Sequence, residues 1–329
     1  MKCINKRFVR VCSLLLVCSL CTISGTGCGE NRLEDAVEAD LPGIGIQTSE
    51  ESSKIPYFAS DLCVTDTDVQ DIEADTEDAL AACFFNLNEK KVLYAKNIHE
   101  RMYPASTTKI MTALVALDKG DLDAQTTVSK EAITFSESGV STAKLKEGDV
   151  LTLRQLLYAL LTVSANDAAN VIAEQIAGSQ DAFVEMMNQE AQKIGATNTH
   201  FVNANGLHNE DHYTTVYDLY LMFNAAMQHE EFLQMLQEKE YQASYQAADG
   251  TTVEAVWSTT NQFTKGDVTV PDGVTAVGGK TGTTTAAMSC LVQLFEDAQG
   301  EQYVAIILGC KERGILYQEM QTFLSNLNN

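Results

Sequence analysis

The order of apolar and polar positions predicts an antiparallel sheet that is interrupted by a block of helices. Apolar stretches at 79–86 and 92–95 flank a polar turn, which is the pattern of a β-hairpin. A second extended pair, at 286–295 and 303–308, flanks the turn Asp297-Ala298-Gln299-Gly300. Apolar residues at helical spacing predict helices over 104–119, 152–161, 167–177, 181–194, 215–227 and 315–327.

These elements predict an α+β fold. The sheet would be built from N- and C-terminal segments and flanked by helices, with a mostly helical lobe inserted between its two halves. Roughly 250 residues follow position 79, which is enough for one well-buried domain with two lobes. We therefore expect one folded domain over residues 79–329.

The first 28 residues differ from the rest and predict an export signal. Residues 1–10 hold four basic residues and no acidic one, and an uncharged apolar stretch follows at 11–23. This pair is typical of a secretory signal and is short for a membrane span. Small residues then precede Cys28, as in bacterial lipoprotein signals, although Gly25 stands where leucine is usual.

We therefore predict a signal or lipoprotein-type leader over 1–28, with Cys28 as the candidate for lipidation. A cleaved signal and an uncleaved anchor stay open as alternatives. In each case the protein would be exported, and it would be secreted or anchored at its N-terminus on the extracytoplasmic face of a bacterial membrane.

Residues 29–78 predict an acidic, disordered linker. They hold 15 acidic residues against the two basic residues Arg32 and Lys54, and so contribute −13 to the net charge of −23. Such a stretch buries too little apolar surface to offset the entropy of ordering. The chain has no basic patch for nucleic acid, and we expect no nucleic-acid partner.

Cysteine and histidine positions predict neither a disulfide framework nor a metal centre. Five of the nine cysteines lie in the leader, and the others follow no metal-binding spacing: Cys63, Cys83, Cys290 and Cys310. Burial as small apolar residues is the simplest interpretation of the last three, and a bridge stays open. His208 and His212 lie four apart in a polar loop without a third ligand, so we expect no metal and no cofactor.

The segment around Ser106 is the first candidate for chemistry. Ser106 and Lys109 lie three apart at the predicted helix start, so an amine is placed within reach of a hydroxyl. A serine is a poor nucleophile unless a neighbouring base takes its proton, and a lysine can do so only when its pKa is lowered. Alone, this S-x-x-K spacing is also explained by an ordinary helix cap.

Two further motifs follow in a fixed order. Ser164-Ala165-Asn166 lies 58 residues after Ser106, and Lys280-Thr281-Gly282 lies 116 residues after Ser164. The three motifs are the set found in serine penicillin-recognising enzymes. Pro104-Ala105 before the first motif and Gly278-Gly279 before the third add to the likeness.

From about Leu80 to about Leu324, the chain resembles the low-molecular-mass penicillin-binding proteins, specifically the serine D-alanyl-D-alanine carboxypeptidases. The resemblance implies a β-lactamase/transpeptidase-like fold. It also implies a peptidase of cell-wall peptidoglycan that removes the terminal D-alanine from stem peptides ending in D-alanyl-D-alanine. β-Lactam antibiotics would be covalent inhibitors.

The resemblance assigns catalytic roles to Ser106, Lys109 and Ser164, and a substrate-binding role to Lys280. Ser106 would attack the carbonyl of the penultimate D-alanine, and Lys109 would accept its proton. Ser164 would pass that proton to the departing amine. Lys280 would supply a fixed positive charge that keeps Lys109 partly neutral and favours a carboxylate.

It also assigns substrate contacts. Asn166 would bind the amide carbonyl of the substrate, and Thr281 and Thr283 would bind its terminal carboxylate. Gly282 would let the strand come close to the substrate. The N–H groups of Ser106 and Thr283 would form the oxyanion hole.

Departures from the family pattern leave alternatives open. Thr260 stands where relatives often carry a basic residue before the asparagine, which puts carboxylate affinity in doubt. Many relatives continue into a second domain and a C-terminal anchor, whereas this chain ends 47 residues beyond Gly282, so an N-terminal anchor would substitute. A β-lactamase is disfavoured because no E-x-x-L-N lies between Ser164 and Lys280. A D-alanyl endopeptidase and a non-catalytic β-lactam sensor also remain.

Overall fold

A computed structural model describes residues 59–327 of the chain. The predicted leader, its Cys28, and residues 29–58 of the predicted linker lie outside the described residues. Those expectations therefore stay predictions.

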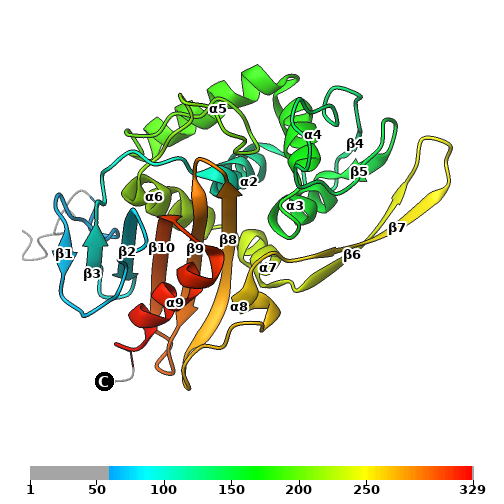
Figure 1. Ribbon diagram of the computed structural model, residues 1–329. Helices are drawn as coiled ribbons and strands as arrows, with labels where there is room; N and C mark the ends of the chain where they lie inside the picture. Colours follow the sequence, from blue (N-terminus) through cyan, green and yellow to red (C-terminus); the bar gives the residue numbers. More distant parts are fainter. Residues whose placement is uncertain (1–58, 328–329) are drawn as a thin grey trace, which may run out of the picture. The chain divides into compact units, whose positions relative to one another are not determined.

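A six-stranded antiparallel sheet joins the two ends of the described chain (Figure 1). β10 lies inside this sheet between β2 and β9, and Ile306 of β10 is opposite Cys83 of β2, as expected when N- and C-terminal segments build one sheet. β8 forms one edge of the sheet and carries the third motif. In spatial order the strands are β1 (Val69–Gln70), β3 (Lys91–Lys96), β2 (Ala81–Asn86), β10 (Gln302–Cys310), β9 (Met288–Glu296) and β8 (Thr275–Thr284).

Both faces of this sheet are buried, which explains why β2 and β10 are apolar without alternation. Ala82 and Phe84 of β2 face the helix α9 (Arg313–Leu324), where Phe84 stacks on Phe323. The alternate residues Cys83 and Phe85 belong to the larger core on the other face, together with α2 (Lys109–Lys119) and α6 (Val216–Ala226).

The predicted helices are confirmed with ends that differ by a few residues. Thr152 caps α3 (Leu153–Leu161) through a capping box with Gln155, as its sequence indicates. The 3₁₀ turn η1 (Ala105–Thr108) precedes α2, so the first motif begins in a tighter turn than an α-helix. The other predicted helices of the inserted lobe are α4 (Asn166–Ala177) and α5 (Gln180–Lys193).

Besides β1, which lies within the predicted linker, five elements were not predicted from the sequence. Four of them are the helix α7 (Glu230–Gln237) and the strands β4 (Gln125–Thr127), β5 (Val150–Thr152) and β6 (Glu240–Gln246). The fifth is the short helix α8 (Gln262–Lys265). β4, β5 and β6 form a second antiparallel sheet with β7 (Thr252–Ser258), and the β6–β7 hairpin is drawn in yellow in Figure 1.

The folded domain begins earlier than the predicted boundary at residue 79. Cys63 is fully buried, and its backbone N–H donates to the Tyr220 hydroxyl at 2.9 Å. Asp68 accepts backbone N–H groups of Asn97 and Ile98 at 2.9 and 3.2 Å, and β1 pairs with β3. The linker prediction is therefore wrong for about its last 16 residues. It was based on the overall acidic composition, which does not show that single carboxylates accept hydrogen bonds from backbone groups of the folded domain.

Neither a bridge nor a metal cluster is found among residues 59–327. Cys63, Cys83, Cys290 and Cys310 are free and buried. No group of three or more His, Cys, Asp or Glu side chains in this range could hold a metal ion. Within the same range, no helix combines the length and the apolar character needed to cross a bilayer.

Candidate active site

The first motif places an amine beside a hydroxyl. Ala105 has a left-handed backbone with φ of 49°, and the turn that follows presents Ser106 next to Lys109. The Lys109 Nζ lies 3.0 Å from the Ser106 Oγ. Lys109 is fully buried, whereas Ser106 is partly exposed and can be reached by a ligand.

The surroundings of Lys109 suit a neutral amine. Besides Ser106, its Nζ contacts the Asn166 Oδ1 at 2.7 Å and the backbone oxygen of Asn205 at 2.5 Å. Both oxygens can only accept, so they use the two N–H donors of a neutral amine and leave its lone pair for the serine hydroxyl. Burial, and then the charge of Lys280, hold the pKa of Lys109 well below its usual range, opposed by Asp167.

The second motif lies where α3 passes into α4. Ser164 has a left-handed backbone with φ of 58°, and Asn166 is the first residue of α4. Ser164 and Asn166 are 6% and 4% exposed. The two side chains contact different lysines. Asn166 contacts Lys109, and the Ser164 Oγ accepts a hydrogen bond from the Lys280 Nζ at 2.9 Å.

Lys280 is also fully buried, on the edge strand β8. Its amine donates to Ser164 and to the backbone oxygen of Thr281 at 2.8 Å. Burial, and then the positive charge of Arg313, lower the pKa of Lys280 to about 7. The role of Lys280 as a positive charge therefore stays a prediction, since an amine with this pKa is only partly protonated near neutral pH.

β8 comes close to the first motif at Gly282. A Cβ at this position would lie 2.9 Å from the backbone oxygen of Pro104 and 3.0 Å from the backbone nitrogen of Ser106. Only glycine allows this approach without displacement of the turn. It brings the backbone of β8 beside the N–H group of Ser106, as the predicted oxyanion hole requires.

Thr281 and Thr283 of β8 lie at the same end of the site. The Thr281 Oγ1 is 2.5 Å from the Thr260 Oγ1, and the Thr283 hydroxyl donates to the backbone oxygen of Gly282 at 2.7 Å. The Arg313 Nη2 donates to the Thr283 Oγ1 at 3.2 Å. Sequence reasoning missed Arg313, because a lone arginine at the start of the C-terminal helix carries no motif.

A loop before α6 completes the surroundings of Lys109. This polar loop was considered for His208 and His212, but the contact that it makes with Lys109 was not predicted from the sequence. It supplies the carbonyl of Asn205, and the next residue, Gly206, has φ of 85°. A Cβ at Gly206 would lie only 2.0 Å from the backbone oxygen of Ala105. The one available signal was the sequence Asn205-Gly206, a typical turn pair.

Comparison with known proteins agrees with this geometry. The family model of peptidase family S11, described as D-alanyl-D-alanine carboxypeptidase, matches residues 68–312. The chain belongs to this family. The match to the family model begins at residue 68, just before β1, so it too includes residues ahead of position 79.

Curated S11 relatives resemble the chain over different lengths. D-alanyl-D-alanine carboxypeptidase DacF of Bacillus subtilis is 38% identical over 46% of this chain and 40% of its own length. DacC of Escherichia coli is 31% identical over 78% and 62%, respectively. DacB2 of Mycobacterium tuberculosis is 35% identical over 73% and 78%. The chain thus spans less than two thirds of the DacF and DacC carboxypeptidases.

Solved structures confirm the fold predicted from the resemblance. The Streptomyces K15 DD-transpeptidase matches with a TM-score of 0.71 and 29% identity, over 77% of this chain and 98% of that one. A putative penicillin-binding protein homolog, Rv2911, from Mycobacterium tuberculosis matches with a TM-score of 0.68 and 30% identity.

His208 and His212 lie in the same loop as Asn205, here called the Asn205 loop, but they do not share a site in this S11 domain. His212 is buried, its Nε2 lies 2.8 Å from the Thr108 Oγ1, and its Nδ1 accepts the backbone N–H of Val202. Burial lowers the pKa of His212 to about 3, so it is neutral. His208 is exposed and packs edge-on against Tyr103, next to the first motif.

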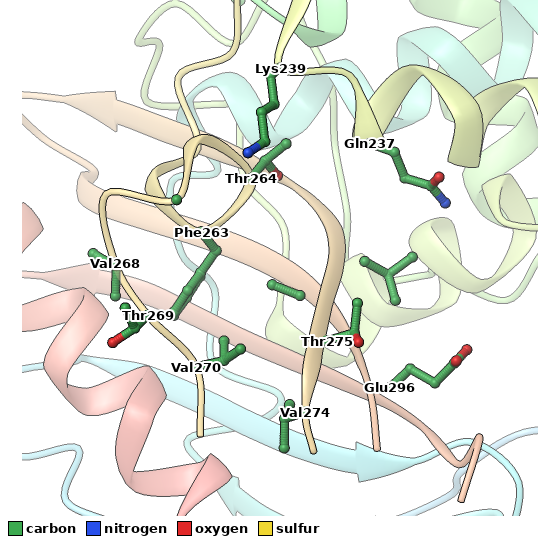
Figure 2. A pocket seen from close by; sticks show the side chains of 13 residues that line it. Gln237, Lys239, Phe263, Thr264, Val268, Thr269, Val270, Val274, Thr275 and Glu296 are labelled. Carbon is green, nitrogen blue, oxygen red and sulfur yellow. The ribbon is translucent and has the colours of Figure 1, made fainter. Parts of the chain in front are cut away.

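A cavity of about 770 Å³ lies apart from the three motifs, beside the first half of β8 (Figure 2). Phe263, Val270 and Val274 form an apolar side of it, and Lys239 and Glu296 lie toward its borders. None of the motif residues lines it. The S11 motifs themselves surround the partly exposed Ser106, and that is where we place the candidate active site.

Proposed function

We propose that this chain is a serine D-alanyl-D-alanine carboxypeptidase that trims peptidoglycan stem peptides through an acyl-enzyme on Ser106. One observation carries the proposal: the fully buried Lys109 amine lies 3.0 Å from the Ser106 hydroxyl, with its other two contacts to oxygen acceptors. A neutral lysine in that position is a base for the serine proton.

In the first step, Ser106 attacks the carbonyl of the penultimate D-alanine while Lys109 takes the hydroxyl proton. The developing oxyanion is stabilised by the backbone N–H groups of Ser106 and Thr283. The proton reaches the departing D-alanine amine through Ser164, which Lys280 holds by a hydrogen bond of 2.9 Å. The carbon–nitrogen bond breaks, and the free D-alanine leaves an ester on Ser106.

In the second step, Lys109 takes a proton from the water that attacks the ester and then gives it to the Ser106 oxygen as the ester bond breaks. The shortened peptide leaves as a carboxylic acid, and Ser106 and Lys109 are restored.

The terminal carboxylate of the intact substrate is bound by the hydroxyls of Thr281 and Thr283 and by the charges of Lys280 and Arg313. Arg313 supplies the cation that Thr260 does not provide. A guanidinium suits this task because it presents paired donors to a carboxylate.

The test is D-alanine release from a peptide that ends in D-alanyl-D-alanine, with the purified full-length chain, its Ser106→Ala variant and a penicillin arm. We expect release by the intact chain alone and one penicilloyl group on Ser106 that persists for longer than a turnover. Neither release nor labelling would refute the catalytic proposal. Rapid loss of the penicilloyl group would instead identify a β-lactamase.

A second candidate function is transfer of the acyl group to an amine. It is favoured by the likeness to a protein titled DD-transpeptidase, with a TM-score of 0.71. An acyl-enzyme open to water is also open to amines, so adding glycine to the same assay separates the two outcomes. A new peptide bond at the expense of hydrolysis would indicate a transpeptidase, and a cross-linked dimer as substrate would test the endopeptidase.

The location also belongs to this proposal. The basic and apolar segments of the leader support export, and an N-terminal anchor at Cys28 would keep the domain beside its cell-wall substrate. Mass spectrometry of the mature N-terminus, for the natural chain and for Cys28→Ala, tests it. A diacylglyceryl group that the variant lacks is the expected result, and an unmodified Met1 in both would refute it.

A further inference from the structure

A buried carboxylate beside the second motif has no role in the chemistry proposed above. Asp167 is 1% exposed and lies in the first turn of α4. Its Oδ1 accepts the backbone N–H of Ala143 at 2.9 Å, and its Oδ2 accepts that of Leu145 at 3.1 Å. Charged acceptors of backbone N–H groups make strong hydrogen bonds in a buried setting.

The segment that Asp167 binds is fastened to the second motif at further points. The N–H of Asn166 donates to the backbone oxygen of Ser141 at 2.8 Å, and the Ser141 hydroxyl donates to the backbone oxygen of Val163 at 2.6 Å. Lys144 has φ of 62°, a conformation that is costly for a side-chain-bearing residue. The contacts on either side of it hold this segment in place.

We propose that Asp167 is a positioning residue of the S11 active site, which fastens residues 141–145 to the second motif and places a buried carboxylate next in sequence to Asn166, whose Oδ1 contacts the Lys109 amine. The inference rests on the proposed function, because it takes Lys109 as the base for Ser106. It adds a residue that touches neither the nucleophile nor the carboxylate-binding end.

The charges around this pair come from several elements. The pKa of Lys109 on α2 is influenced by the charges of Lys280 on β8 and Asp167 on α4, and the charge of Lys109 in turn lowers the pKa of His212. The charge of Asp167 also raises the pKa of Tyr245 of β6, after burial and Asp149. Asp167 is the negative group named here that acts on Lys109, and it raises the pKa of that amine against burial and Lys280. Its removal should lower the pKa of Lys109 further.

The chain offers a matched control in Asp218. This aspartate also lies in the first turn of a helix, α6, and is 2% exposed. Its Oδ2 accepts the backbone N–H of Asn198 at 2.7 Å and the Thr199 hydroxyl at 2.8 Å. Asp218 is not one of the leading influences on the pKa of Lys109. Loss of its charge therefore perturbs stability without the proposed effect on the amine.

The experiment measures the rate of penicillin acylation against pH for the full-length chain and the variants Asp167→Asn, Asp167→Glu and Asp218→Asn. For Asp167→Asn we expect the acid limb to move to lower pH by roughly one unit. Its plateau should fall by roughly tenfold, because an amide cannot accept both N–H groups. Asp167→Glu should restore the position of the limb but not the plateau, and Asp218→Asn should change neither.

Two results would overturn the proposal. One is an acid limb that does not move in Asp167→Asn, or that moves by the same amount in Asp218→Asn. The other is a normal plateau in Asp167→Glu, which tests the fastening even if the asparagine variant does not fold. An intact chain that penicillin does not acylate at all would refute the proposed nucleophile first, so the two failures are distinguishable.

Discussion

A single methyl group at Gly282 tests how the oxyanion hole is built. In Gly282→Ala the new Cβ would lie 2.9 Å from the Pro104 oxygen, 3.0 Å from the Ser106 nitrogen and 3.1 Å from the Thr107 nitrogen. These distances are shorter than ordinary carbon contacts, so the turn that carries the nucleophile has to move by a few tenths of an ångström. The same methyl group would shield the N–H of Ser106 from a ligand.

The expected loss of acylation rate follows from the shielding of one donor, the N–H of Ser106. Removing one oxyanion donor elsewhere costs about 100- to 1,000-fold in rate, or ~3–4 kcal/mol. Overpacking costs stability too, about 1–3 kcal/mol, and the strand backbone itself accepts alanine because Gly282 has no left-handed φ. We therefore expect penicillin acylation to fall by at least about 100-fold in a protein that remains folded.

The assay is a time course of penicilloyl-enzyme by mass spectrometry, beside thermal unfolding. Gly314→Ala is the control, since its Cβ would meet nothing within 4 Å, and it should be acylated normally. Acylation of Gly282→Ala at a rate close to that of the natural chain would refute the assignment of the Ser106 N–H.

Three other changes have defined outcomes. Arg313→Leu should lower kcat/KM for a carboxylate-ended peptide by about 10- to 100-fold while leaving the poor turnover of the C-terminal amide unchanged, and parallel assays of both peptides measure this. Tyr220→Phe leaves the buried N–H of Cys63 without its 2.9 Å acceptor, which should cost about 1–3 kcal/mol in urea unfolding; an unchanged midpoint would mean that residue 63 is not part of the folded domain. Because Lys280 has a pKa of about 7 when folded and 10.5 as the reference, the unfolded chain binds more protons between these values, and stability should rise with pH in this window by up to ~1.4 kcal/mol per unit. Lys280→Met should reduce that slope.

The fold was predictable where local physics decides it. The helices at 152–161 and 104–119 depend on neighbours in the sequence, and the structure has α3 and α2 there. β6 was missed because its face pattern is fixed by tertiary contacts, such as the stacking of Tyr241 on Tyr158. The start of the domain was missed because its burial depends on Tyr220, 157 residues away.

The same division applies to the site. Ser106 and Lys109 are joined by helical spacing, so their contact could be inferred before the structure. Asn205 acts through its backbone oxygen, which any residue could supply, and Arg313 reaches Thr283 from a distant helix. Arg313 belongs to no local sequence motif, and the only local signal of the Asn205 loop is the turn pair Asn205-Gly206.

Burial of two lysines in one site destabilises their charged forms, and the proposed mechanism needs one of them, Lys109, to be neutral. Burial alone disfavours charge on each, and the mutual repulsion of Lys109 and Lys280 disfavours two protons in the pair. Without a ligand, Lys280 titrates at about 7. A substrate carboxylate bound beside Thr281 would raise the pKa of Lys280, and the charge gained there would keep the proton off Lys109. Lys280, which binds the substrate carboxylate, would then also set the protonation state of the base Lys109. A substrate whose carboxylate binds Lys280 well would therefore also activate Ser106.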